Sequence, residues 1–231
     1  MPNIVILTGA GISAESGIST FRDHNGLWET HRFEALATPE AFRRDPVLVH
    51  RFYNARRAQL KTVQPNAAHL ALATLEREWR ERGEFLLVTQ NVDDLHERAG
   101  SVRPVHMHGE IRKLRCGGCG DVVWHEDDAG PLLACRNCSQ VGRMRPDIVW
   151  FGEMPYGMEE IHTAVERADI FVAIGTSGVV YPAAGLTAAA RGNRRGCRTI
   201  EINPQPTGAA VFQSVIAETA VTGVPKLLAL L

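Results

Sequence analysis

Ile4-Val5-Ile6-Leu7-Thr8-Gly9-Ala10-Gly11-Ile12-Ser13-Ala14, close to the start of the chain, joins a continuous apolar run to a glycine-rich turn. The apolar run predicts a strand that is covered on both faces, as in a parallel sheet. The turn has the pattern G-x-G-x-x-G/A with Ala14 in the last place, and glycines at such a turn let backbone amides approach a pyrophosphate. A tight strand-to-helix turn without a ligand remains the alternative. The stretch therefore favours an α/β fold with a dinucleotide at the turn.

Similar apolar runs alternate with helical stretches along the rest of the chain. Three of them predict further strands, at residues 85–89, 170–174 and 199–202. Between the strands we predict helices, beginning after the capping residue Asn66 and ending near Arg82, and at residues 159–168 and 183–191. Strands that alternate with helices predict a Rossmann-like α/β fold, a doubly wound parallel sheet.

Two segments interrupt this alternation. Residues 28–62 read as helical, with Asp45 as an N-cap and Pro46 at the first helical position. Residues 113–142 are rich in Gly, Cys, Arg and Asp, and include a short strand-like piece. We therefore predict a smaller lobe made of a helical insertion, 28–62, and a zinc ribbon, 113–142. The remaining residues, 1–27, 63–112 and 143–231, are predicted to form the Rossmann-like domain that binds the dinucleotide.

The zinc prediction rests on the spacing Cys116-x2-Cys119-x15-Cys135-x2-Cys138, which is typical of sites built from two CxxC pairs. Four thiolates complete a tetrahedral Zn2+ shell and leave no position for water or substrate, so one structural zinc is expected. A redox dithiol and His125 as a replacement ligand are the alternatives. The basic residues nearby suggest a third alternative, a zinc ribbon that binds nucleic acid. No aromatic residues are interleaved with them, so we interpret them mostly as a solvated face. They are Arg112, Lys113, Arg115, Arg136, Arg143 and Arg145.

Composition limits the class of protein and its partners. The chain has 231 residues, 45% of them apolar and 22% charged, with a net charge of -1, so disorder and strong electrostatic steering to nucleic acid or membrane are disfavoured. No apolar run approaches the roughly 18 residues of a membrane span, and the first residues lack a signal-peptide pattern. Cysteines in CxxC pairs fit a reducing compartment, and Cys197 is expected to be buried. We expect a cytoplasmic monomer.

The residues after the glycine-rich turn depart from an ordinary dehydrogenase, which would continue with a helix, a strand and a ribose-binding acid about twenty residues on. Here residues 17–28 are polar and turn-rich, more like a loop that closes over a ligand. A dinucleotide is still expected, but hydride transfer is not.

Ordered motifs over essentially the whole chain make the sequence resemble the sirtuins, the NAD-dependent protein-lysine deacylases. The resemblance is closest to the bacterial, desuccinylase-like (class III) subgroup. It is carried by Gly9-Ala10-Gly11-Ile12-Ser13, Phe21-Arg22-Asp23, Gly26-Leu27-Trp28, Thr89-Gln90-Asn91-Val92-Asp93, His108-Gly109-Glu110, the four cysteines, Phe151-Gly152-Glu153, Gly175-Thr176-Ser177 and Glu201-Ile202-Asn203.

The resemblance implies a reaction in which NAD is a co-substrate. The acyl oxygen of a modified lysine attacks the nicotinamide ribose and nicotinamide leaves. The ribose 2'-hydroxyl then attacks the acyl carbon, and water completes the release of free lysine and 2'-O-acyl-ADP-ribose. Asn91 and Asp93 match residues that line the nicotinamide and ribose site, although alone they would read as turn formers. Imidazole chemistry suits the proton transfers for either His106 or His108. The family pattern chooses His108, which directly precedes Gly-Glu.

The remaining site residues also follow from the resemblance. Matches to NAD-contacting positions are Gly9, Ala10, Gly11, Ser13, Phe21, Arg22, Gln90, Asn91, Asp93, Gly175, Thr176, Ser177, Asn203 and Ala220. The substrate peptide is expected to lie as an added strand between two edges matched by Val149, Phe151, Gly152, Glu153 and Val180. Acyl-lysine-bearing proteins or peptides are the expected partners.

Tyr53 and Arg56 bear on which acyl group is removed. Residues three apart share a helical face, and a guanidinium beside a phenol suits a carboxylate. A solvated surface arginine is the alternative from spacing alone. The pair resembles the Tyr and Arg that bind the acyl carboxylate in the sirtuins that remove succinyl and malonyl groups. Ala37 matches a small pocket residue of those sirtuins that leaves room for the longer acyl chain.

Two other functions stay open from the sequence. ADP-ribosyl transfer to protein would share the early loss of nicotinamide. A zinc-ribbon module that senses NAD without turning it over belongs to a different class.

Overall fold

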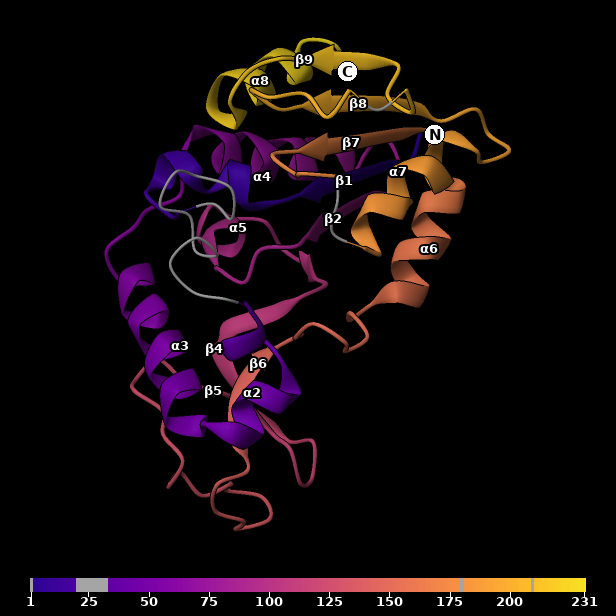
Figure 1. Ribbon diagram of the computed structural model, residues 1–231. Helices are drawn as coiled ribbons and strands as arrows, with labels where there is room; N and C mark the ends of the chain where they lie inside the picture. The colour runs from indigo at the N-terminus through magenta and orange to yellow at the C-terminus, as the bar shows by residue number, and fades with distance from the viewer. Residues whose placement is uncertain (1, 20–32, 179–180, 209) are drawn as a thin grey trace.

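The computed structural model of the chain describes residues 2–19, 33–178, 181–208 and 210–231. These residues form a parallel sheet with helices on both faces and a smaller group of helices around a second sheet (Figure 1). The predicted fold class, a doubly wound sheet with a smaller lobe, is confirmed.

The larger sheet has six strands in the order β3-β2-β1-β7-β8-β9, and every neighbouring pair is parallel. Its strands are β1 (Ile4–Thr8), β2 (Phe85–Thr89), β3 (Val105–His106), β7 (Ile170–Ile174), β8 (Arg198–Ile202) and β9 (Ser214–Ile216). Thr8 pairs with Thr89 on one side and Ile174 on the other. The carboxyl ends of β1, β2 and β7 therefore lie level along one edge, where open α/β sheets place ligands.

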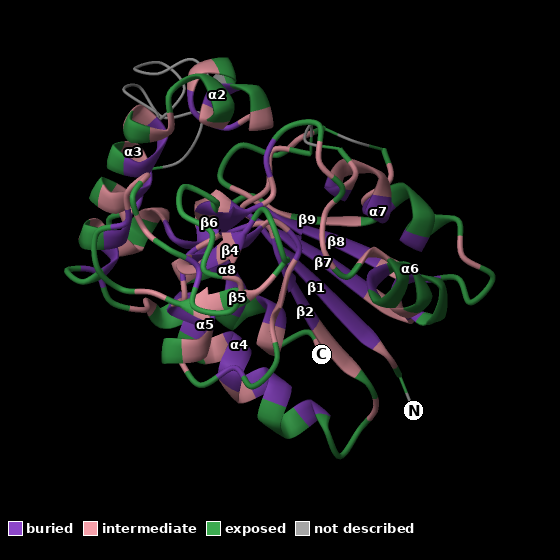
Figure 2. Cartoon of the chain, turned by 90° about the horizontal axis from the view of Figure 1, so that it is seen from below, coloured by how far each residue is buried: buried purple, intermediate pink, exposed green. Residues whose placement is uncertain are grey.

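Four helices cover the two faces of this sheet. They are α4 (Ala67–Trp79) and α8 (Ala220–Leu228) on one face, and α6 (Met158–Arg167) and α7 (Ala183–Arg191) on the other. Successive residues of a strand point to opposite faces. Ile4 and Ile6 accordingly join the core of α4 and α8, while Val5 and Leu7 join that of α6 and α7. Burial on both faces explains the continuous apolar runs, which are mostly purple in Figure 2.

The elements that directly follow β1 and β2 are short. Two 3-10 turns, η1 (Ala10–Ile12) and η2 (Ala14–Ser16), follow β1, and the short helix α5 (Leu95–Arg98) follows β2. Asn66 caps α4 as predicted, since its side chain accepts a hydrogen bond from the Ala68 amide. Of the helices in the described parts of the chain, none is both long and apolar enough to cross a membrane.

The smaller lobe joins helices to a three-stranded antiparallel sheet. Its helical elements are η3 (Phe33–Ala35), α2 (Pro39–Arg44) and α3 (Pro46–Leu60), and its strands are β4 (Gly109–Cys116), β5 (Val122–Trp124) and β6 (Met144–Ile148). β4 is central, with β5 and β6 on either side. Since β4 begins at Gly109 and β6 ends at Ile148, this sheet extends beyond residues 113–142 at both ends. Figure 1 shows α3 beside β4 and β6, below the larger sheet.

Candidate active site and zinc centre

The glycine-rich turn lies where β1 ends, against the loop that follows β7. The Gly9 amide donates to the Ile174 carbonyl and the Gly11 amide to the Gly175 carbonyl, both at 2.9 Å. A Cβ atom on Gly11 would lie 2.6 Å from the Gly175 Cα, a separation that no side chain tolerates. The glycines are therefore needed because two loops pack backbone to backbone, and these two amides are already hydrogen-bonded within the protein.

Three buried polar side chains, those of Ser13, Asn91 and Asp93, are hydrogen-bonded to one another next to this turn. The Asn91 side-chain amide donates to Ser13 Oγ at 3.1 Å and to the Gly9 carbonyl at 3.2 Å. Ser13 Oγ donates to Asp93 Oδ2 at 3.0 Å, and the Leu95 amide donates to Asp93 Oδ1 at 3.2 Å. Burial raises the pKa of Asp93, while these two hydrogen bonds to the carboxylate act to lower it. The side chains of Asn91 and Asp93 are thus fixed in place at the end of β2.

Polar side chains also connect the ends of three strands. Gln90 follows β2, and its side-chain amide donates to Thr176 Oγ1 at 3.1 Å. Asn203 follows β8 and donates to the Thr176 carbonyl at 2.9 Å. Thr176 itself follows β7, so one edge of the sheet carries amide, hydroxyl and carboxylate groups beside the glycine-rich turn. Such a set can hydrogen-bond the ribose, phosphate and amide groups of a dinucleotide.

His108 lies between β3 and β4, close to the same edge. Its Nδ1 is 3.1 Å from the Gln90 carbonyl, and because a carbonyl can only accept, Nδ1 must carry the hydrogen. Burial lowers the pKa of His108, although the hydrogen bond to Gln90 acts in the opposite direction. A neutral imidazole with its lone pair on Nε2 is therefore favoured, which is the form that a general base needs.

The four cysteine sulfurs gather at the far end of β4. These atoms all lie within 4.8 Å of one another, and the pairs Cys116–Cys138 and Cys119–Cys135 are each 3.7 Å apart. A tetrahedral Zn2+ with Zn–S bonds of about 2.3 Å requires sulfur separations of about 3.8 Å. The Gly118 amide donates to Cys116 Sγ, a contact typical of thiolate ligands. The four cysteines therefore fit one closed, structural zinc site.

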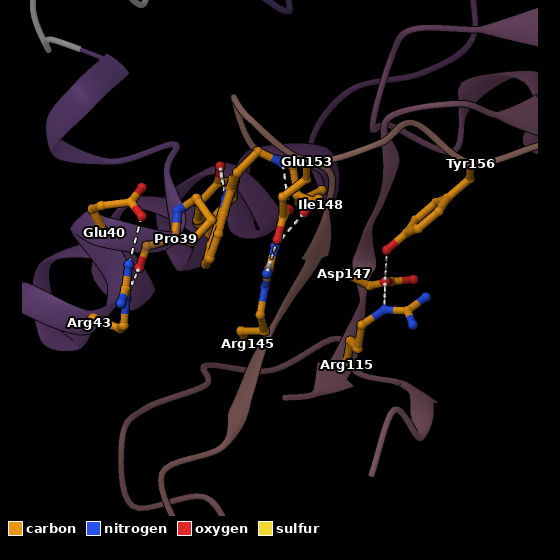
Figure 3. A network of polar contacts seen from close by, with 11 residues as sticks. Pro39, Glu40, Arg43, Arg115, Arg145, Asp147, Ile148, Glu153 and Tyr156 are labelled. Atoms are coloured by element: carbon orange, nitrogen blue, oxygen red, sulfur yellow. Dashed lines mark hydrogen bonds and ion pairs between the residues drawn. The ribbon is translucent and has the colours of Figure 1, made fainter. Parts of the chain in front are cut away.

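The segment after β6 is held by a network around Arg145. The Arg145 guanidinium binds both carboxylate oxygens of Glu153, at 2.6 and 2.8 Å, and lies 3.5 Å from the centre of the Trp150 ring. Glu153 Oε2 also accepts from the Trp150 amide at 2.9 Å, and these contacts lower the pKa of Glu153 although burial alone would raise it. Figure 3 shows Glu153 facing Arg145. The carboxylate of Glu153 thus shapes the segment.

The backbone of this segment connects the two lobes. The Val149 amide donates to the His108 carbonyl, and the Phe151 amide to the Ala37 carbonyl, at 2.9 and 3.0 Å. Phe151 is 46% exposed, and Gly152 has a φ of +90° that a side chain would strain. The candidate peptide edge is therefore tied to His108 at one end and to the small lobe at the other.

Tyr53 and Arg56 lie three residues apart on α3, and the Arg56 guanidinium lies 5.7 Å from the centre of the Phe52 ring. Tyr53 is 5% exposed, and its hydroxyl accepts from Trp150 Nε1 at 3.0 Å. Burial raises the pKa of Tyr53 to about 12. Burial also lowers the pKa of Arg56, although the charges of Tyr53 and Asp93 act to raise it. Among the residues that the structure describes, no carboxylate forms an ion pair with Arg56. Ala37 is buried in the same cluster as Tyr53.

A family model described as the Sir2 family matches residues 9–182. The chain belongs to the Sir2 family. Two curated relatives are each named NAD-dependent protein deacylase. One, from Escherichia coli strain K12, is 56% identical over 208 residues, which cover 89% of this chain and 73% of the relative. The other, from Shewanella oneidensis, is 54% identical over 228 residues, which cover 97% and 92%.

Solved Sir2 structures share the fold. A Sir2 homologue in complex with NAD is 42% identical, with a TM-score of 0.86 over 98% of this chain and 88% of that one. Sir2 with a p53 peptide and NAD+ is 29% identical, with a TM-score of 0.82 over 98% and 92%. This Sir2 chain therefore has the fold of proteins that were crystallised with NAD.

The structure brings together many of the residues that the sequence assigned to the Sir2 site. Gly9, Gly11, Ser13, Gln90, Asn91, Asp93, Gly175, Thr176 and Asn203 are joined by the contacts above, Ala10 lies within the turn, and Ser177 follows Thr176. Ala220 begins α8, and its side chain is 3% exposed and packed in the sheet core. Phe21, Arg22 and Val180 lie outside the described residues.

Two features of the Sir2 site were not found from the sequence. Arg145 was expected on a solvated face, which is wrong, because its side chain is 15% exposed and pairs with Glu153. His106 was considered only as a rival to His108, whereas it contacts Glu97. An arginine eight residues before a glutamate, or a histidine nine after one, gives no periodic signal. Only the tertiary fold brings these pairs together.

Proposed function

We propose that this NAD-dependent protein deacylase of the Sir2 family removes succinyl and malonyl groups, as well as acetyl groups, from lysine side chains. The observation that carries the proposal is the pairing of Tyr53 with Arg56 on α3. Arg56 is partly buried and has no ion-pair carboxylate among the described residues. A guanidinium in this setting favours a ligand that brings a carboxylate of its own.

The proposed acyl pocket is bordered by a small residue on one side. Ala37, Tyr53 and Trp150 belong to one buried cluster, and the Tyr53 hydroxyl already accepts the Trp150 hydrogen bond. The phenol hydrogen of Tyr53 therefore remains to be donated, and an acyl carboxylate is a suitable acceptor. Ala37 would leave room for the longer acyl chain.

The proposed roles of the catalytic residues follow from their protonation and contacts. Bound NAD supplies a nicotinamide–ribose bond whose cleavage makes the ribose an acyl acceptor. His108 keeps a hydrogen on Nδ1 for the Gln90 carbonyl, so Nε2 is the atom that takes a proton from a ribose hydroxyl. Asn91 and Asp93, fixed by Ser13, would orient the nicotinamide ribose.

Acyl-lysine proteins or peptides are the proposed partners, and the segment at residues 149–153 is the proposed docking edge. Its support is the exposure of Phe151 and the fixed backbone between His108 and Ala37. An extended peptide can add to such an edge through main-chain hydrogen bonds. Action as a monomer in the cytoplasm, without specific nucleic acid, remains a prediction, as does the division into a sheet domain and two small-lobe insertions.

The pairing of Tyr53 with Arg56 is tested by Arg56→Met. Hydrogen bonds to charged groups contribute about 1.5–3 kcal/mol, so kcat/KM for a succinyl-lysine peptide should fall about 10- to 100-fold. Turnover of the matched acetyl-lysine peptide should change little. NAD-dependent release of nicotinamide measures both.

Arg51→Met is the matched control, because Arg51 lies on the same helix and is exposed. It should leave both substrates unaffected. An unchanged ratio of succinyl to acetyl turnover in Arg56→Met would show that the arginine does not bind the acyl carboxylate.

A further inference from the structure

Two histidines, His106 and His108, hold consecutive carbonyls of the loop after β2. His108 Nδ1 lies 3.1 Å from the Gln90 carbonyl, and His106 Nδ1 lies 3.1 Å from the Asn91 carbonyl. The other ring nitrogen of His106, Nε2, is 2.6 Å from Glu97 Oε1. The His106 side chain is 7% exposed and that of Glu97 35%. A chain of contacts thus runs from α5 through β3 to the backbone of Asn91.

The two acceptors around His106 determine its protonation. A carbonyl and a carboxylate both accept hydrogen bonds, so each ring nitrogen must carry a hydrogen, and the ring is an imidazolium. Burial alone would lower the pKa of His106, but the hydrogen bond and charge of Glu97, with the charge of Glu110, raise it overall. His106 therefore differs from His108, whose pKa is lowered.

Charged groups face His106 from several elements. Glu97 comes from α5 and Glu110 from β4, and Asp93 lies in the loop after β2. His96, also on α5, is buried, and its pKa is lowered well below 6.5 by burial and then by neighbouring histidines, His106 among them. Lys113 contacts the Glu110 carboxylate. Glu97 is therefore paired with His106 and Glu110 with Lys113, so these carboxylates already have cationic partners and are not a free set of metal ligands.

We propose that His106, held by Glu97, is a positioning residue for deacylation, which fixes the Asn91 carbonyl and places a positive charge beside Asp93. The inference rests on the proposed function, in which Asn91 and Asp93 orient the nicotinamide ribose. Asn91 is gripped from both sides, since its carbonyl accepts from His106 and its side chain donates to Ser13. A shift of this loop would move both ribose-binding side chains together.

The positive charge of His106 acts to lower the pKa of Asp93. Burial raises the pKa of Asp93, whereas the nearby His106 cation is among the influences that lower it. Both oxygens of Asp93 accept hydrogen bonds, which suits the ionised form. Removing the cation should raise the pKa of Asp93, so that activity is lost at a higher pH as the solution is acidified. A residue with only a packing role would lower activity equally at every pH.

Three substitutions separate position from charge. His106→Asn places a side-chain amide near the Nδ1 position, so it can keep the hydrogen bond to Asn91 without the charge. His106→Gln places its amide near the Nε2 position and loses the bond to Asn91. Glu97→Gln keeps the shape of the partner and removes the charge that holds the His106 proton. Glu78→Gln is the control, since Glu78 is exposed on α4.

The experiment measures kcat/KM for NAD, with an acyl-lysine peptide, from about pH 5.5 to 9, together with the melting temperature of each variant. We expect the acid limb, the part of the pH profile where activity falls as the solution is acidified, to move to higher pH in all three variants. It should not move in Glu78→Gln. His106→Gln should also lose about 10- to 100-fold at the plateau because the loop is misplaced, and His106→Asn should recover most of that loss.

The outcomes distinguish the inference from the function on which it rests. An acid limb that stays at the wild-type pH in all three variants, whatever the plateau, overturns the inference. Glu97→Gln keeps the test valid if a His106 variant fails to fold, because it leaves the imidazole in place. Absence of peptide-dependent nicotinamide release by the wild type would instead overturn the proposed function.

Discussion

Histidines at different positions of this protein have pKa values shifted in opposite directions. His106 is held as a cation by Glu97, whereas burial lowers the pKa of His108 and lowers that of His69 to about 4. His69 is fully buried, and its Nδ1 lies 3.0 Å from Asn66 Oδ1. The sequence shows histidines but not their surroundings, so it could nominate His106 and His108 together and could not separate them without the family pattern.

His69 should make the stability of the protein depend on pH. Its pKa is about 4 in the folded protein, against an ordinary value of 6.5 for a solvated histidine, so between these values the unfolded chain binds more protons. The free energy of unfolding should therefore fall as the pH drops from about 6.5 to about 4, by up to about 3 kcal/mol from this residue. Chemical denaturation of wild type and His69→Gln across this range would measure it.

The free energy of unfolding of His69→Gln should depend less steeply on pH than that of the wild type. Any loss of zinc at low pH should affect both proteins equally. His162→Gln, at an exposed position on α6, should keep the wild-type slope. Equal slopes for wild type and His69→Gln would exclude the buried neutral histidine as a source of the acid sensitivity.

Elements were predictable where burial or capping leaves a local pattern. The four apolar runs became β1, β2, β7 and β8, and Asp45 with Pro46 begins α3 as predicted. β3 and β9 have two and three residues, too few for a period to show. α8 was missed because Pro225 lies inside it, and a proline normally argues against a helix interior.

The N-cap of α3 gives a prediction for that element. Asp45 Oδ1 accepts from the Leu48 amide at 2.9 Å, and removing such a cap costs about 0.5–2 kcal/mol. Asp45→Ala should lower the free energy of unfolding by about that amount, and Asp45→Asn, which keeps an acceptor oxygen, by much less. Because α3 carries Tyr53 and Arg56, fraying should raise the KM for succinyl-lysine more than for acetyl-lysine. Similar free energies of unfolding for Asp45→Ala and Asp45→Asn would show that the Asp45 side chain does not stabilise α3 as an N-cap.

At the scale of the whole molecule, the candidate site is built from segments far apart in the sequence. The position of the site at the sheet edge could be predicted from the alternation of strands with helices and from the glycine-rich turn, and individual residues came from the resemblance to a family. The Arg145–Glu153 pair, the hydrogen bond from Trp150 to Tyr53 and the contact between Phe151 and Ala37 could not, because each joins elements whose packing no local pattern encodes.

The four-cysteine site lies on the ribbon that links His108, the proposed general base, to the proposed peptide edge at residues 149–153. β4 begins directly after His108 and ends at Cys116, and β6 leads from the ribbon to the segment after Ile148. The core of the ribbon is small, formed by Leu114, Ala129, Met144 and two of the cysteines. So few apolar side chains cannot replace metal–thiolate bonds as the source of folding free energy. Loss of zinc should therefore disorder β4 and β6.

Removal of zinc should abolish deacylation even though the closed four-cysteine site offers no position for substrate. Cys135→Ser should lose zinc, and its backbone amides in β4 and β6 should exchange with solvent much faster than in the wild type, while those of β1 and β7 stay protected because the six-stranded sheet has its own core. Cys197→Ser is the matched control, since Cys197 is buried in the sheet domain and not among the four clustered sulfurs. It should keep zinc, protection and turnover. A zinc-free Cys135→Ser protein with wild-type turnover and protected β4 amides would show that the ribbon holds its shape without the metal.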